Sequence, residues 1–270
     1  MQNMKALLSF DTEEFDVPRE KGVEISLQDS MRVSREGTLR ILDVLRRNGV
    51  KATFFCTANF VREAPDVMRV IIGDGHEVAS HGVDHWHPQP SDVEQSKIII
   101  EQFTGCKVTG YRQPRMFPVS ELEIARCGYL YNSSLNPTFI PGKYMHLNSP
   151  RRPFMLDGVL QIPASVTPWV RFPLFWLSYH HLPGSWYRAL VRRTIRHEGY
   201  FTTYFHPWEF YPLGEHPEFK LNFVHARHSG PDMAARLDLL IKDLKRLGAE
   251  FTTFTPFARE WISKNQNSNS

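Results

Sequence analysis

The feature that most constrains the fold of this 270-residue chain is an alternation of short apolar runs with longer amphipathic segments. Strand-like runs lie at residues 6–10, 51–57, 76–81, 107–112, 129–134, 159–165, 200–206 and 250–255. Segments with helical spacing of apolar residues lie mostly between them, at residues 34–49, 65–72, 91–105, 120–128, 186–197 and 231–248. The alternation predicts an α/β fold, a distorted (β/α) barrel of about seven or eight strands with its active site at the C-terminal ends of the strands.

No linker rich in Pro, Gly or Ser divides the chain, so we expect one domain over residues 1–262. Residues 263–270 are polar and lack apolar anchors, and we expect a disordered tail there. Two predicted helices carry the spacing of a capping box, at Ser91 with Glu94 and at Ser120 with Glu123. We expect both serines to cap their helices.

Composition excludes several classes of protein. The net charge of +3, from 32 basic and 29 acidic side chains, is too small to indicate a nucleic-acid partner. No run approaches the roughly 18 apolar residues of a spanning helix, and the N-terminus lacks a leader pattern, so we expect a cytoplasmic protein. The three cysteines are far apart with no CxxC spacing, which argues against a disulfide framework or a cysteine zinc site.

Two clusters of polar residues follow predicted strands. The stretch Ser9–Asp16, "SFDTEEFD", packs four carboxylates behind the first strand, and on an extended segment Asp11 and Glu13 point the same way. In "HGVDH", His81 and His85 are four residues apart, and on a turn of helix such a pair can bind one divalent metal together with a carboxylate. The competing interpretations are a solvated acidic loop and a chance histidine pair.

Two further polar residues end predicted strands. Arg112 is followed by Pro114, which stiffens the turn, and His206 is followed by Pro207. Alone, each is more typical of a surface ion pair or a hydrogen-bonded structural histidine. Because all four features fall at strand ends of one βα series, one barrel mouth would collect them, and together they form the inventory of a metal-assisted hydrolase.

On these motifs the chain resembles polysaccharide deacetylases of the NodB-homology type, carbohydrate esterase family 4, over about Leu7–Phe257. It is most similar to the branch with "SFDxE" openings and "HPWE" endings. The resemblance implies that Asp11 is the catalytic base. The family's second aspartate, a metal ligand, is replaced by Thr12, so the implied carboxylate ligand is Glu13, with Glu14 as its rival.

The remaining motifs imply further roles. "HGVDH" implies that His81 and His85 are metal ligands. "RQPR" implies that Arg112 holds the base in its ionised form and that a backbone N–H near Arg115 stabilises the oxyanion. "YFH" implies that His206 protonates the departing amine. The motif that carries an aspartate in many relatives is only loosely echoed here, with Asn132 at that position.

The function implied by this resemblance is metal-dependent removal of an N-acyl group, acetyl first, from an amino sugar of a polysaccharide, lipid-linked or nucleotide-linked glycan of the cell envelope. Zinc is the first choice of metal, with cobalt, nickel or iron as alternatives. Trp208 and Glu209 are expected to line the sugar pocket. The rival functions are a deformylase, a cyclic-amide hydrolase of the same fold, and a non-catalytic carbohydrate-binding barrel.

Residues 163–196 are dense in Trp, Phe, Leu and Arg. One interpretation is a buried barrel helix with a loop over the active site. The other is a surface that lies on the inner face of a membrane, with aromatic residues inserted and Arg188, Arg192, Arg193 and Arg196 at anionic head groups. The sequence predicts no oligomeric state.

Overall fold

The centre of the fold is strand β1 (Lys5–Thr12), in which every residue after Lys5 is buried. The computed structural model describes residues 4–266. In it, β1 pairs in parallel with β10 (Tyr200–Phe205) on one side and with β2 (Thr53–Cys56) on the other. These strands are apolar along both faces because packed side chains cover both sides of the sheet.

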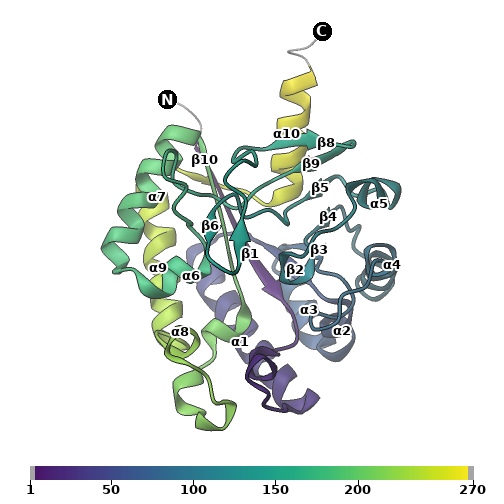
Figure 1. Ribbon diagram of the computed structural model, residues 1–270, viewed down its shortest axis with the longest axis vertical. Coiled ribbons are helices and arrows are strands. Elements are labelled where there is room, and N and C mark those ends of the chain that lie inside the picture. The colour runs from purple at the N-terminus through teal and green to yellow at the C-terminus, as the bar shows by residue number, and fades with distance from the viewer. Residues whose placement is uncertain (1–3, 267–270) are drawn as a thin grey trace.

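The main sheet has nine strands, in the order β10-β1-β2-β3-β4-β5-β9-β8, with β11 also paired to β1 (Figure 1). All of its pairs are parallel except β8 with β9. The other strands of this sheet are β3 (Glu77–Ser80), β4 (Gly110–Tyr111), β5 (Tyr131–Asn132), β8 (Phe154–Leu156), β9 (Val159–Gln161) and β11 (Glu250–Phe251).

The sheet curls until its two ends meet. The irregular segment directly after β9 lies against β10, and there the Ser165 N–H donates to the Thr202 carbonyl over 3.1 Å. The predicted distorted α/β barrel is therefore confirmed. All eight predicted strands are present, although the observed strands are mostly shorter than the apolar runs that predicted them.

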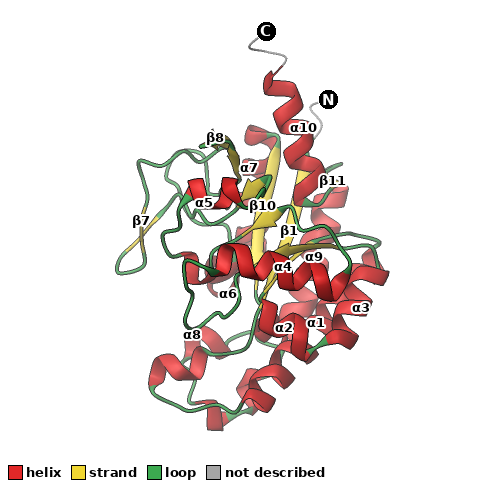
Figure 2. Ribbon diagram, turned by 90° about the vertical axis from the view of Figure 1, so that its right-hand side faces the viewer, coloured by secondary structure: helices red, strands yellow, loops and turns green. Residues whose placement is uncertain are grey.

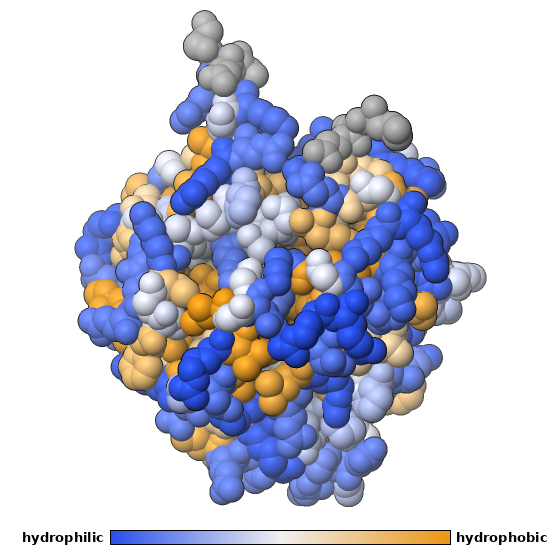
Figure 3. All heavy atoms as spheres, turned by 180° about the vertical axis from the view of Figure 1, so that it is seen from behind, coloured by the Kyte–Doolittle hydropathy of each residue, from blue (hydrophilic) through white to orange (hydrophobic). Residues whose placement is uncertain are grey.

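Ten helices surround the sheet in the described part of the chain. They are α1 (Leu27–Asn48), α2 (Ala58–Glu63), α3 (Pro65–Gly73), α4 (Asp92–Thr104), α5 (Glu121–Arg126), α6 (Trp176–His181), α7 (Gly184–Glu198), α8 (Phe223–Ala226), α9 (Pro231–Arg246) and α10 (Phe254–Gln266). Helices α1, α3 and α9 lie on the side of the molecule opposite β7 and β8 (Figure 2). Seen from that side, the outline is mostly hydrophilic, with hydrophobic atoms in a central band (Figure 3).

None of these helices combines the length and the apolar character needed to cross a bilayer. Two local predictions were tested by the helix ends. Ser120 does accept a hydrogen bond from the Glu123 N–H, at 3.4 Å, as expected. The prediction for Ser91 was wrong, because its backbone is already helical (φ −66°, ψ −16°) and its side chain caps nothing.

The chain near the C-terminus also departs from expectation. Helix α10 starts at Phe254, so the predicted strand at 250–255 is limited to β11, and the helix runs on to Gln266. The first residues of the expected disordered tail, 263–266, are therefore helical. The remainder of that tail lies outside the described residues.

A two-stranded hairpin of β6 (Phe139–Ile140) and β7 (Tyr144–Met145) projects from the body of the fold (Figure 2). The sequence did not predict this hairpin. In the segment 163–196, most large apolar side chains, including Phe175 and Tyr179, are buried in the core. The interpretation of a buried helix with a loop fits most of that segment, and four of its large apolar residues are exposed, namely Trp169, Val170, Phe172 and Trp186.

The strand register explains how the polar strand ends meet. Thr12 pairs with Cys56, Cys56 pairs with Ser80, and Ser80 pairs with Tyr111 along neighbouring parallel strands. The residues that directly follow these positions therefore emerge at the same edge of the sheet. This is the C-terminal edge, where the sequence placed the active site.

Candidate active site

Glu13 and two histidines form a compact cluster at this edge. The Glu13 Oε2 atom lies 3.1 Å from His81 Nε2 and 3.2 Å from His85 Nε2. One ligand atom from each residue lies within 4.8 Å of the other two. A carboxylate and two imidazoles at this spacing form a donor set suited to a divalent metal ion.

The outer nitrogen of each imidazole is held by another group, which orients the ring. His81 Nδ1 lies 2.8 Å from the Arg112 carbonyl oxygen, and His85 Nδ1 lies 2.6 Å from Asp16 Oδ2. Each ring therefore presents Nε2 toward Glu13. Acceptors behind metal-binding histidines play this role in metal sites, so the residues present fit a bound cation.

The charges around His85 also favour a bound cation. Burial disfavours the protonated ring, but the carboxylates of Glu13 and Asp16 raise the pKa of His85 to about 9. The cluster thus stabilises positive charge, which either a proton or a metal ion can supply. The histidine pair itself lies in the loop after β3, where Gly82 has φ 73°, so the predicted turn of helix was wrong.

Of the two carboxylates left open by the sequence, only Glu13 faces the histidines. Glu14 turns away and its Oε2 accepts a hydrogen bond from Thr57 Oγ1 at 2.7 Å. Thr12 is fully buried at the end of β1 and does not line the pocket. Asp11 and Glu13 both line the pocket and Thr12 does not, as expected for alternate residues of an extended segment.

Asp11 and Arg112 form a buried ion pair beside the cluster. Arg112 Nη1 donates to Asp11 Oδ1, and the rest of the guanidinium is held by Ser9 Oγ at 3.1 Å and by the Ser133 carbonyl at 3.0 Å. Burial raises the pKa of Asp11, but the charges of Arg112, His81 and His206 and the hydrogen bond from Arg112 together outweigh it, and the pKa lies below its usual value. Asp11 is therefore a carboxylate held in its ionised form.

His206, directly after β10, is the third polar group. Its Nδ1 lies 2.9 Å from Glu209 Oε1, and the other oxygen of Glu209 lies 2.8 Å from His180 Nε2. His180 Nδ1 in turn contacts the Arg227 carbonyl at 2.8 Å. Burial lowers the pKa of His206, but the hydrogen bond to Glu209 and nearby carboxylates raise it above the usual value.

The expectation that Glu209 lines the sugar pocket was wrong. Its side chain is completely buried behind His206, between two imidazoles, and it does not face the cavity. The reason is local: Glu209 lies in the 3₁₀ turn η3 (Pro207–Phe210), which folds its carboxylate back onto the His206 backbone N–H at 2.6 Å.

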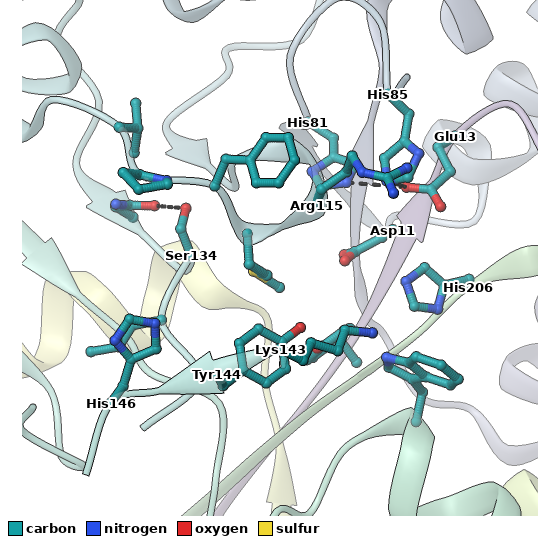
Figure 4. A pocket seen from close by; sticks show the side chains of 18 of the residues that line it. Asp11, Glu13, His81, His85, Arg115, Ser134, Lys143, Tyr144, His146 and His206 are labelled. Carbon is teal, nitrogen blue, oxygen red and sulfur yellow. Dashed lines mark hydrogen bonds and ion pairs between the residues drawn. The ribbon is translucent and has the colours of Figure 1, made fainter. Parts of the chain in front are cut away.

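One pocket of about 850 Å³ is lined by Asp11, Glu13, His81, His85 and His206. Figure 4 shows Asp11, Glu13, His81, His85 and His206 gathered on one side, with Tyr144 and His146 on the other. Trp176 and Trp208 also line the pocket and pack against the His206 ring, at centroid distances of 5.4 and 5.1 Å.

The last two predicted substrate contacts, Arg115 and Trp208, both line this pocket. Arg115 Nη2 lies 2.9 Å from Glu20 Oε1 at the pocket wall. Arg115 has φ 56° and the next residue, Met116, has φ 54°, a conformation uncommon for residues with side chains. Their roles stay predictions.

Comparison with known proteins finds similarity to one family in part of the chain. A family model described as polysaccharide deacetylase matches residues 16–117. A chitooligosaccharide deacetylase from Bradyrhizobium is 33% identical over 78 residues, which are 29% of this chain and 35% of the relative. A polysaccharide deacetylase homologue from Mycobacterium smegmatis superposes with a TM-score of 0.69 at 18% identity, over 98% of this chain and 92% of that one. Residues 16–117 of this chain are thus similar to polysaccharide deacetylases in sequence, and the described chain shares their fold.

The similarity in sequence covers a smaller part of the chain than the similarity in fold does. The matching segments span about a third of the length of the curated relatives. The fold likeness spans nearly the whole chain and extends to PuuE allantoinase, with a TM-score of 0.63 at 17% identity over 96% of this chain and 90% of that one. A deacetylase-like protein and an allantoinase thus share the fold of this chain.

The sequence analysis did not identify three residues that support this candidate site. Asp16 was noticed as part of the acidic run, but nothing in its spacing indicates that it holds His85. His180 comes from α6, and Ser133 from the end of β5; no local pattern links either to the strand ends they support. The asparagine at position 132 was the one sign in the sequence that a carboxylate from elsewhere in the chain would contact His206.

Proposed function

We propose that this chain is a metal-dependent hydrolase that removes an N-acyl group, acetyl first, from an amino sugar of a polysaccharide, lipid-linked or nucleotide-linked glycan. One observation carries the proposal, the convergence of three groups in one pocket. They are a buried carboxylate paired with an arginine, a carboxylate with two histidines, and a histidine backed by a buried carboxylate. The match of residues 16–117 to the polysaccharide deacetylase model and the similarity to a chitooligosaccharide deacetylase support the deacetylase reaction over other amide hydrolyses.

Glu13, His81 and His85 would hold the metal ion. Their imidazole and carboxylate ligands suit zinc first and cobalt, nickel or iron next. A bound divalent ion supplies Lewis-acid chemistry, since it polarises the amide carbonyl and lowers the pKa of water.

Asp11 is the proposed base. Arg112 keeps its carboxylate ionised and fixed at one oxygen, and the residue lines the pocket. Asp11 accepts a proton from the attacking water while the water oxygen bonds to the amide carbon. Arg112 is 1% exposed, so it acts by positioning and charging Asp11, without contact with the substrate.

His206 is the proposed acid. Glu209 occupies its Nδ1, so Nε2 is the atom left to deliver a proton to the amine nitrogen as the carbon–nitrogen bond breaks. The raised pKa of His206 keeps a larger fraction of the ring protonated near neutral pH. The products are a free amine on the sugar and the released carboxylic acid.

The pocket walls support binding of a sugar. Tyr144, Trp176 and Trp208 offer flat apolar faces, and the volume is at the upper end of the range of small-molecule sites. An oxyanion donor at the Arg115 backbone is proposed from the family motif. The left-handed backbone at Arg115 and Met116 supports a specialised turn there, because such conformations cluster at functional sites.

The test measures the metal content of the purified protein and its rate of acetate release. We expect the purified protein to contain about one divalent ion per chain, to release acetate from N-acetylated chitooligosaccharides, and to lose this activity on chelation. Asp11→Asn should abolish turnover and leave metal content largely intact. If the substitution instead strips the metal, then Asp11 is a ligand and the roles of base and ligand are exchanged.

The same assay separates the rival functions. Faster release of formate from N-formyl sugars would make the protein a deformylase, and hydrolysis of allantoin without deacetylation would make it a cyclic-amide hydrolase. Glycan binding by a metal-free, inactive protein would leave a carbohydrate-binding barrel in place of the proposed enzyme.

A further inference from the structure

Positive charge is concentrated in one part of the chain. Residues 137–198, up to the end of α7, contain eight of the 32 Lys and Arg side chains and two of the 29 Asp and Glu side chains. The rest of the chain therefore carries more acidic than basic side chains. This asymmetry is not visible in the small net charge of the whole protein.

The same part exposes large apolar side chains. In and beside the β6–β7 hairpin, Met145 is 79% exposed and Leu147 is 47% exposed, and in the loop after β9 Trp169 and Val170 are 66% and 79% exposed. Soluble proteins do not commonly expose such residues in neighbouring loops unless the surface binds something.

Hydrogen bonds join the two loops. Thr138 Oγ1 donates to the Arg171 carbonyl at 2.7 Å, and Arg171 Nη1 donates to the Ser149 carbonyl at 2.7 Å. The chain around the hairpin and the loop that carries Trp169 and Val170 are therefore adjacent parts of one surface.

Two arginines beside this surface have no acidic partner. The Arg193 guanidinium lies 4.7 Å from the centre of the Trp169 ring, and Trp169 and Arg196 line the same surface depression. Within residues 4–266, neither Arg193 nor Arg196 forms an ion pair, whereas Arg188 and Arg192 of the same helix both bind Asp243. Free cations next to exposed aromatic and aliphatic groups are the pattern of a surface that contacts anionic lipid.

The hairpin also lines the pocket from inside, through Lys143, Tyr144 and His146 (Figure 4). One loop thus has two faces, with Tyr144 toward the cavity and Met145 toward solvent, as expected for alternate residues of a strand.

We propose that Met145, Leu147, Trp169, Val170, Arg193 and Arg196 form a docking surface for a lipid bilayer with anionic head groups, and that the pocket opens beside the bilayer. The apolar side chains would enter the boundary between head groups and acyl chains, and the two arginines would contact lipid phosphates. The sequence predicted membrane contact along residues 163–196. The proposed surface includes only the exposed loop and two arginines of that segment, and it also includes residues in and beside the β6–β7 hairpin. The proposal rests on the surface and not on the proposed hydrolysis.

The test is flotation of the full chain with phosphatidylcholine vesicles, with and without phosphatidylglycerol, over a series of salt concentrations. We expect binding that requires phosphatidylglycerol and weakens with salt. Arg193→Gln and Arg196→Gln should each weaken the partition constant about fivefold. Trp169→Ser with Val170→Ser should weaken it about tenfold or more, because apolar area is lost.

The matched control is Leu239→Ser in α9, which removes an apolar side chain that is 46% exposed and is not part of the proposed surface. It should bind vesicles as the unchanged protein does, and circular dichroism should show that all variants are folded. The proposal is overturned if the unchanged protein does not float with anionic vesicles, or if the Trp169 and Val170 substitutions bind as well as the control. Neither result bears on the hydrolase assay, which uses soluble substrates.

Discussion

At the scale of single residues, Glu209 has the clearest consequence. This carboxylate is completely buried, and its pKa is held down, against the effect of burial, by hydrogen bonds from His180 and His206. Its hydrogen bond and charge stabilise the protonated form of His206, whose pKa lies above its usual value. A buried charge of this kind is tolerated only because both of its oxygens are hydrogen-bonded.

We therefore predict that Glu209→Gln lowers the pKa of His206. The protonated ring is the active form, so the activity lost as pH rises would be lost at lower pH than in the unchanged protein. The rate at pH 8 should fall about 10-fold to 100-fold, and pH–rate profiles of both proteins measure the shift. As a control, Glu218→Gln removes a carboxylate from His216 on the surface and should change nothing. An unmoved alkaline limb in Glu209→Gln would exclude His206 as the acid.

A second prediction concerns the acidic run. Glu13→Gln should reduce metal affinity at least about tenfold, because a neutral amide replaces the anionic ligand between two histidines. Glu14→Gln should leave the affinity unchanged, since Glu14 is bonded to Thr57. Competition with a chelator measures both. Equal losses in the two variants would contradict the assignment of the ligand.

At the scale of elements, the contact of helix α1 with the turn η3 holds the backbone next to His206 in place. Gly37 in α1 packs so closely on the backbone of Pro207 that a Cβ atom at residue 37 would lie 1.9 Å from the Pro207 carbonyl oxygen. Pro207 directly follows His206 and begins the turn that carries Glu209. Glycine is thus required in the middle of a helix, where it is otherwise unfavourable.

We predict that Gly37→Ala lowers the free energy of unfolding by about 1–3 kcal/mol and also lowers kcat, because relief of the clash moves the backbone of η3. Thermal denaturation and kinetics measure the two effects. Gly73→Ala at the end of α3 is the control, since nothing lies within 4 Å of its Cβ position, and it should be neutral or slightly stabilising. Matching behaviour of the two variants would mean that the α1 contact does not position the site.

At the scale of the whole molecule, the candidate metal site joins distant parts of the chain. Glu13 follows β1, while His81 and His85 follow β3, and Asp16 and Arg112 orient the rings. These segments are together only in the folded state, so a bound metal ion favours the folded over the unfolded chain.

We predict that free zinc at about 100 times its Kd stabilises the fold by about 2.7 kcal/mol and raises Tm by about 5–10 °C. Differential scanning calorimetry of the metal-free protein, with and without zinc, measures this shift. His85→Ala should abolish the shift. His87→Ala, an exposed histidine two residues away, should retain it; loss of the shift in both variants would point to a zinc site elsewhere in the loop.

The sequence alone was sufficient for eight of the nine strands of the main sheet, for six of the helices, and for Asp11, His81, His85, Arg112 and His206 after strands. These features depend on local periodicity and on parallel strands, which bring all carboxyl ends to one edge. The tertiary structure decided which of Glu13 and Glu14 faces the histidines, turned Glu209 from a pocket wall into the support of His206, and gave Asp16 a role. It also buried most of residues 163–196 and left Trp169 and Val170 exposed. Each of these outcomes depends on contacts between residues far apart in the chain, or on how the backbone turns after a strand, and no local pattern of residue types encodes either.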